Sequence, residues 1–94
     1  MTTSKVYKPA VRLDGNTAAA AEREVLALLV DDVHSVTIDL SSVDYVSSAG
    51  LRVLLVSAKA AKAKGGKVVL FSPKPAILEV IKISGFDRIL EIQF

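Results

Sequence analysis

Short apolar runs alternate along this sequence with longer amphipathic stretches, and a loop of a few residues joins each pair. The clearest apolar run, Val36–Leu40, alternates apolar and polar side chains as a half-buried strand does. The longest amphipathic stretch, from about Ser48 to Lys64, carries its apolar residues at helical spacing. Its expected buried stripe consists of Leu51, Leu54, Leu55, Ala58 and Ala61. The alternation favours helices packed on a largely parallel or mixed sheet.

The first part of the chain fits this pattern. Val6 to Leu13 has strand character, and Pro9 places it at an edge because proline cannot donate a ladder hydrogen bond. After the Asp14–Thr17 turn, helical spacing predicts a helix from Ala18 to Val33.

The last third continues it. Gly65-Gly66 predicts a helix stop, followed by a strand over Lys67–Phe71 that is apolar enough to be buried on both faces. A third helix begins at the prolines Pro73 and Pro75 and ends at Gly85, with Ile77, Val80, Ile81 and Ser84 on its inner face. A short strand, Glu91 to Phe94, closes the chain.

The composition is that of one small domain, residues 1–94. Half of the residues (51%) are hydrophobic, enough for a single core, yet the longest apolar run, Val25–Val30, is far too short to span a membrane. The first residues lack the apolar centre of a signal peptide, so we expect a cytoplasmic protein without membrane insertion. Without cysteine and with His34 as the lone histidine, we expect no metal site and no cofactor.

Two hydroxyls stand at the junction between the strand-like Tyr45-Val46 and the long helix. Ser47 and Ser48 are both N-cap candidates, because the first turn of a helix leaves backbone N–H groups unpaired. A phosphate on either serine would carry about −1.5 to −2 charges beside the positive end of the helix dipole. The plain alternative for Ser48 is a capping role alone, worth about 1 kcal/mol.

Charge is unevenly distributed along the chain. From Gly50 onward eight Lys/Arg stand against three Asp/Glu, which leaves +5. The basic residues of the second helix and its exit are Arg52, Lys59, Lys62, Lys64 and Lys67. They allow a nucleic-acid stripe, a solvated helix face or a match to an acidic patch on a partner, but no aromatic residue is interleaved for base stacking, so we expect no direct nucleic-acid binding.

No set of residues points to catalysis. Asp14 and Asp39 could be taken for paired carboxylates, but a turn cap and an exposed strand residue are the commoner roles. No base, nucleophile and orienting group converge in the sequence, so we expect no enzyme.

Three segments together resemble a known family. They are VTIDLSSVDYVSSAGLRVLL, AKAKGGKVVL and SPKPAILEVIKISGFDRIL, and they cover about two-thirds of the chain in order. The sequence is similar to STAS domains, specifically the bacterial anti-sigma factor antagonists. The resemblance implies an α/β STAS fold, with a small mixed sheet of about four to five strands and about three to four helices.

The resemblance implies a phosphorylation-controlled partner switch. The unmodified protein would bind an anti-sigma factor that is also a serine kinase, and phosphorylation at the start of the second helix would release it. A phosphatase of the PP2C type would reset the switch. An alternative job for a STAS domain is that of an accessory subunit in a membrane lipid-transport ABC complex, acting without phosphorylation. We expect a monomer.

Aligned with the family's Asp-Ser-Ser/Thr-Gly site, the acceptor is Ser48, with Ser47 as the alternative acceptor. Here Ser47 replaces the aspartate and Ala49 replaces the second hydroxyl residue. The family's Gly-x-Leu-Asp segment fits Arg12–Gly15 in either of two registers. The implied partner-binding residues are Asp14, Ser47, Ser48, Ala49, Arg52, Val53 and Val56, the last two through the exposed part of their side chains.

Overall fold

The computed structural model describes residues 4–94, which form two parallel sheets and three α-helices. The main sheet has the order β1 (Ser4–Tyr7), β3 (Ser35–Asp39), β5 (Val68–Phe71), β6 (Glu91–Gln93). The small sheet pairs β2 (Arg12–Leu13) with β4 (Tyr45–Val46). The helices are α1 (Ala18–Leu28), α2 (Ser48–Ala63) and α3 (Pro75–Ile83), followed by a short 3-10 helix, η1 (Phe86–Arg88). The predicted α/β class is confirmed.

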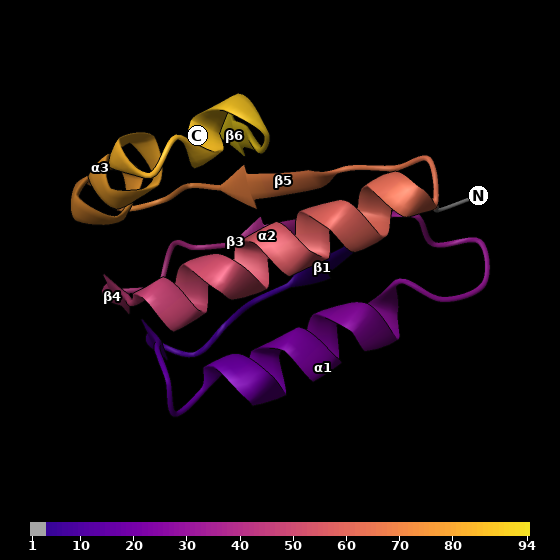
Figure 1. The fold of residues 1–94 in the computed structure, drawn as a ribbon, viewed down its shortest axis with the longest axis horizontal. Coiled ribbons are helices and arrows are strands. Elements are labelled where there is room, and N and C mark those ends of the chain that lie inside the picture. Colours follow the sequence, from indigo (N-terminus) through magenta and orange to yellow (C-terminus); the bar gives the residue numbers. More distant parts are fainter. Residues whose placement is uncertain (1–3) are drawn as a thin grey trace.

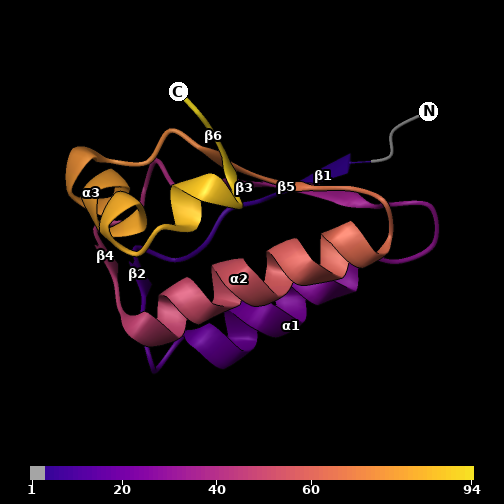
Figure 2. The ribbon, with the colours of Figure 1, turned by 45° about the horizontal axis from the view of Figure 1, so that its top comes forward.

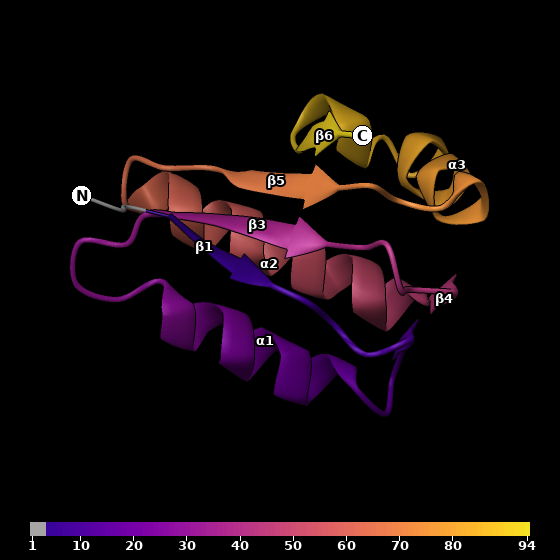
Figure 3. The ribbon, with the colours of Figure 1, turned by 180° about the vertical axis from the view of Figure 1, so that it is seen from behind.

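Helices α1 and α2 lie side by side on one face of the main sheet (Figures 1 and 2). Seen from behind, the strands β1, β3 and β5 lie in front of both helices, and no described helix crosses that face (Figure 3). The apolar side chains of β3, Val36, Ile38 and Leu40 at its end, are buried towards the helices, as the alternation predicted. The alternate residues Thr37 and Asp39 on the open face are half-buried.

Pro9 divides the expected first strand into two. β1 stops at Tyr7 and pairs only with β3, so it is an edge strand as expected, whereas β2 belongs to the other sheet. The buried Pro9 has no N–H with which to continue the ladder, and the chain bends shortly after it, at Val11. The Tyr7 hydroxyl donates a hydrogen bond to the Glu24 carboxylate (2.5 Å), which fastens β1 to α1.

Helix α1 is shorter than predicted. It ends at Leu28, and Asp31 adopts a left-handed backbone conformation with φ 53°. The periodicity had placed Leu29 and Val33 within the helix. They lie instead in the loop that follows it, and their side chains are buried there. The ammonium of Lys64 donates to the carbonyl oxygens of Leu29 and Asp31, both at 3.1 Å, so α2 supplies partners to this loop. The apolar spacing thus continued beyond the point where the backbone leaves the helix.

Helix α2 buries a different stripe from the one expected. Leu54 and Ala61 are fully buried as predicted, but Leu51, Leu55 and Ala58 are only half-buried. The remaining buried positions of the helix are Gly50, Val53 and Ser57. Because α2 packs against α1 as well as against the sheet, its contact face is turned and widened towards α1. The apolar spacing in the sequence is compatible with both the expected and the observed buried stripe, so it does not distinguish them.

The C-terminal segment follows the prediction closely. β5 buries Val68, Val69 and Leu70, while Phe71 is partly exposed. Ile77 and Ile81 of α3 enter the core, but Ser84 is exposed, and its hydroxyl donates to the Val80 carbonyl instead of facing inward. Gly85 takes the left-handed conformation (φ 77°) that ends the helix. These turns return the chain to the sheet as β6.

Candidate functional site

The candidate site is the start of α2, where the small sheet β2–β4 meets the helix (Figures 1 and 2). Ser47 has an extended backbone (φ −90°, ψ 177°) and directly precedes the helix as its N-cap. Its backbone N–H donates to the Leu13 carbonyl of β2 (3.0 Å), and its own carbonyl accepts from Leu51 N–H (2.9 Å). The helix therefore begins at a position fixed by β2.

The two serines differ in their hydrogen bonds. The Ser47 Oγ accepts a hydrogen bond from Gly50 N–H at 3.3 Å, the bond that defines a side-chain N-cap. Ser48 is the first residue of the helix and is exposed, and its hydroxyl has no hydrogen-bond partner among residues 4–94. The plain capping role that the sequence allowed for Ser48 thus belongs to its half-buried neighbour. The Ser48 hydroxyl is thus exposed and not used by the cap.

Gly50 permits the close contact between helix and β2. A Cβ at this position would overlap the carbonyl oxygen of Leu13, so any larger residue would push β2 away from the first turn. Leu13 itself is buried, with 1% of its surface exposed. The Gly that follows the serines is thus a packing requirement of the site.

Asp14 lies next to Leu13 and is held by local contacts. Its carboxylate accepts hydrogen bonds from Arg12 Nε (3.1 Å) and from the backbone N–H of Asn16 (3.0 Å). These contacts, the Arg12 bond first, hold the pKa of Asp14 below its usual 3.8. The carboxylate is therefore ionised at neutral pH, and by accepting the Asn16 N–H it closes the turn that leads into α1, the role expected for a turn cap.

The remaining predicted contact residues divide into exposed and buried ones. Arg52 is exposed and stands four residues after Ser48, so both lie on one side of the helix. Ala49 and Val56 are half-buried. Val53 is only 3% exposed, and the expectation that part of it reaches the surface is wrong. Helix α1 and the sheet together enclose that side of α2, so Val53 belongs to the core.

Sequence analysis missed two side chains that flank the site. Residues 12 and 45 pair across the small sheet, and the Arg12 guanidinium lies 4.5 Å from the centroid of the Tyr45 ring. Tyr45 is 44% exposed, an unusual position for an aromatic residue. Asp44 also forms an ion pair with Lys74, at the start of α3. The only sequence signal for this surface was a tyrosine two residues before the serines.

No helix of the described chain is long and apolar enough to cross a membrane. Within residues 4–94, no three His, Cys, Asp or Glu side chains gather where they could hold a metal ion.

Known proteins resemble this chain in sequence and in fold. The family model described as the STAS domain matches residues 2–93. BtrV of Bordetella bronchiseptica, named as an anti-sigma factor antagonist, is 41% identical over 75 residues, covering 80% of this chain and 65% of that protein. The chain thus spans just under two-thirds of that relative's length.

Solved structures of the anti-sigma factor antagonist SpoIIAA have the same fold. Its unphosphorylated form matches with a TM-score of 0.81 and 18% identity, covering 97% of this chain and 81% of that one. The phosphorylated form from Bacillus matches with a TM-score of 0.73 and 18% identity, covering 97% and 84%. At this identity the likeness is one of fold.

Proposed function

This chain belongs to the STAS domain family, and we propose that it is an anti-sigma factor antagonist whose partner binding is switched off by phosphorylation of Ser48. The observation that carries the proposal is that the two serines have different hydrogen bonds. Ser47 caps α2 with its hydroxyl, which leaves the exposed Ser48 hydroxyl free at the first helical position. A kinase can reach Ser48 without breaking the cap.

Before modification, the site offers the partner an uncharged hydroxyl at Ser48. Ser48 is a small exposed hydroxyl three residues after Tyr45, whose exposed ring is covered by the Arg12 guanidinium from β2. Aromatic side chains of this kind often anchor protein interfaces. We therefore assign the contact with the anti-sigma factor to Tyr45, Ser48, Arg52 and the exposed part of Val56, with Asp14, Ser47 and Ala49 shaping the surface beneath them.

A phosphate on Ser48 would change the charge of this surface more than its shape. It would add about −1.5 to −2 charges, stabilised locally by the positive end of the α2 dipole and by Arg52 one turn further along. Docking would then require that charge to be desolvated, which is costly unless the partner supplies a cation. The phosphate is thus compatible with the fold but disfavours binding of the anti-sigma factor. The switch therefore needs no large conformational change.

The proposed partners are those that the resemblance to anti-sigma factor antagonists implies. An anti-sigma factor with serine kinase activity would both bind the site and modify it. A PP2C-type phosphatase would restore the hydroxyl. The protein itself would act as a regulator in this scheme, without catalysis of its own.

Mass spectrometry of the intact protein after incubation with the cognate anti-sigma kinase and ATP tests the acceptor. We expect the mass of one added phosphate, lost in Ser48→Ala and retained in Ser47→Ala. Modification that persists in Ser48→Ala would contradict the assignment.

Calorimetry with the same partner tests the switch. Ser48→Asp should weaken binding at least about tenfold, a free-energy change of about 1.4 kcal/mol. Unchanged affinity would contradict the electrostatic mechanism. Copurification with a transporter ATPase, and with no kinase, would instead support the alternative role as an accessory subunit of a membrane lipid-transport ABC complex.

A further inference from the structure

A basic groove lies at the far end of α2 from Ser48. It has a volume of about 540 Å³ and is lined by the second half of α2, by the residues that lead into β5, and by the end of η1 with Ile89 after it. Its apolar floor is formed by Leu55, Ala58, Val68 and Ile89. Ile89 is 57% exposed, so the floor opens to solvent and an apolar side chain could be added to it from outside.

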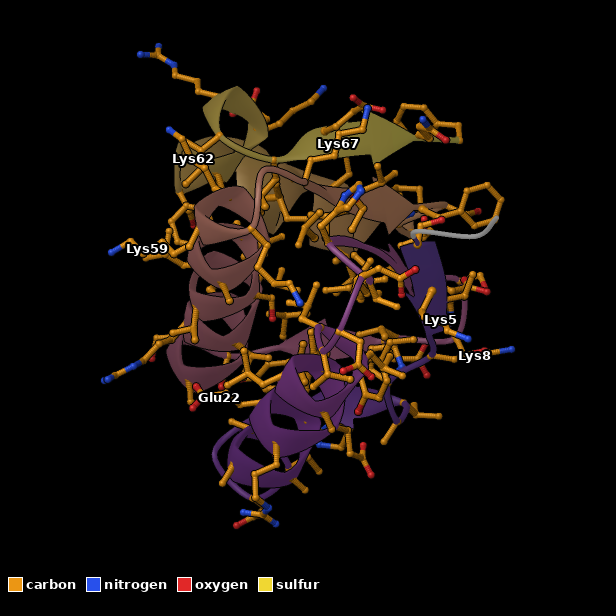
Figure 4. All side chains as sticks on the ribbon, turned by 90° about the vertical axis from the view of Figure 1, so that its right-hand side faces the viewer. Lys5, Lys8, Glu22, Lys59, Lys62 and Lys67 are labelled. Carbon is orange, nitrogen blue, oxygen red and sulfur yellow. The ribbon has the colours of Figure 1, made fainter. Side chains whose placement is uncertain are left out.

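Four cations surround this floor. Lys59 and Lys62 stand one turn apart on α2, and Lys67 and Arg88 stand across the groove on other segments. Figure 4 shows Lys59 and Lys62 projecting from the same side of α2. No acidic side chain lines the groove in the described part of the chain.

Most of this charge is not compensated within the domain. Lys67 pairs with Glu91 at 2.9 Å, and both side chains are largely exposed. Lys59, Lys62 and Arg88 form no ion pair with any residue from 4 to 94. A solvated helix face does not need an apolar floor between its cations, whereas a binding surface for an acidic, partly apolar ligand does.

We propose that this groove binds an acidic amphipathic helix of a partner protein, with an apolar side chain on the Leu55–Ile89 floor and carboxylates against Lys59, Lys62 and Arg88. The open site suits a helix laid in a groove better than a small molecule, which needs enclosure on most sides. The cations also stand on separate segments, so they match several carboxylates along a helix rather than one headgroup.

The groove works independently of the proposed phosphorylation. Ser48 and Lys62 are fourteen residues apart on one helix, a separation of about 20 Å along its axis. In physiological salt, screening strongly weakens the interaction between exposed charges that are more than about 8–10 Å apart. A phosphate at Ser48 therefore has little effect on the groove, and the protein can hold one partner here while releasing another.

Titration of the isotope-labelled protein with a synthetic acidic peptide, followed by NMR of the backbone amides, tests the proposal. The probe is a helix of about 14 residues with two leucines four positions apart and glutamates around them. We expect shifts confined to the groove segments around residues 55–68 and 88–89. The same peptide with both leucines replaced by serine should bind several-fold more weakly, as should Ile89→Ser with the original peptide.

Charge-reversal variants supply the matched control. Lys59→Glu/Lys62→Glu should weaken peptide binding at least about tenfold. Lys5→Glu/Lys8→Glu makes the same change in net charge on the opposite side of the domain and should leave binding unchanged (Figure 4). Ser48→Asp should also leave peptide binding unchanged. The outcome of this test is therefore independent of the test of the phosphoserine switch.

Three results would overturn the proposal. They are shifts that map to another surface, equal weakening by both charge-reversal pairs, and equal shifts of the groove amides by inorganic phosphate alone. The first two would show general attraction to a basic domain, and the third a simple anion site without a peptide groove.

Discussion

A Cβ added to Gly50 would overlap the carbonyl oxygen of Leu13. The same carbonyl accepts the N–H of Ser47, so β2 lies directly against the first turn of α2. One backbone oxygen thereby positions both the helix cap and the strand beside it. The location of the Ser48 hydroxyl depends on this contact.

Gly50→Ala should destabilise the fold, because the overlapping atom belongs to the backbone of β2 and cannot rotate away. We expect a loss of about 1–3 kcal/mol in the free energy of unfolding, measured with urea. Gly15→Ala is the control, since a Cβ there meets no atom within 4 Å. An equal, small effect of both substitutions would show that β2 yields without cost.

The two serines should separate in stability as well as in modification. Ser47→Ala removes the cap bond to Gly50 N–H and should cost about 1 kcal/mol. Ser48→Ala removes an exposed hydroxyl and should change stability by less than about 0.5 kcal/mol. Thermal unfolding of both variants checks which one is less stable. A larger loss of stability in Ser48→Ala would contradict the assignment of the cap to Ser47.

Val53 and Val56 should behave oppositely in stability and binding. Val53→Ala leaves a cavity in the core and should cost about 1–3 kcal/mol of unfolding free energy. Val56→Ala, at a half-buried position, should cost less and should weaken binding of the anti-sigma factor. Urea unfolding combined with calorimetry distinguishes the two. A weakly destabilising Val53→Ala would contradict its burial.

Asp14 should make part of the stability depend on pH. Its pKa in the folded protein lies below 3.8, chiefly because Arg12 donates a hydrogen bond to it. Stabilisation is therefore complete above the unfolded pKa and is lost as pH falls through the lower, folded pKa. Asp14→Asn should flatten the fall in stability between about pH 5 and pH 2. Asp32→Asn, in the exposed loop after α1, is the control, and an identical profile for both variants would exclude the effect.

Lys64 should order the loop after α1. Its ammonium donates to the Leu29 and Asp31 carbonyls, and Lys64→Met removes both bonds. With a net loss of about 1 kcal/mol, amide hydrogen exchange at Leu29 and Val33 should become about fivefold faster. Lys82→Met removes the same charge from α3 and should leave these amides unchanged. Unaltered exchange in the Lys64 variant would show that the loop is held by Leu29 and Val33 alone.

Much of the architecture followed from local patterns. The strand at residues 36–40 was predicted within one residue at each end, and α2 was predicted to within one residue of its C-terminus. Helix stops at Gly65 and Gly85 were also expected, and both glycines have positive φ values. These features depend on side-chain periodicity and on the conformational freedom of glycine, both of which are local properties.

The errors lie where distant segments meet. Helix α1 was extended to Val33, because a buried loop residue at helical spacing resembles helix from sequence alone. Val53 was placed at the surface, because the periodicity could not show that α1 packs against that side of α2. The Arg12–Tyr45 contact joins two strands of two residues each, too short to predict as a pair.

The sequence by itself determined that one of two serines would cap a long helix at the end of a strand. It could not determine which, since Ser47 and Ser48 have the same hydroxyl and the same local propensity. The tertiary structure decided this through Leu13, whose carbonyl holds the Ser47 N–H and keeps Ser47 extended while Ser48 enters the helix. That bond is made by a strand more than thirty residues earlier in the chain, so no local pattern could encode it.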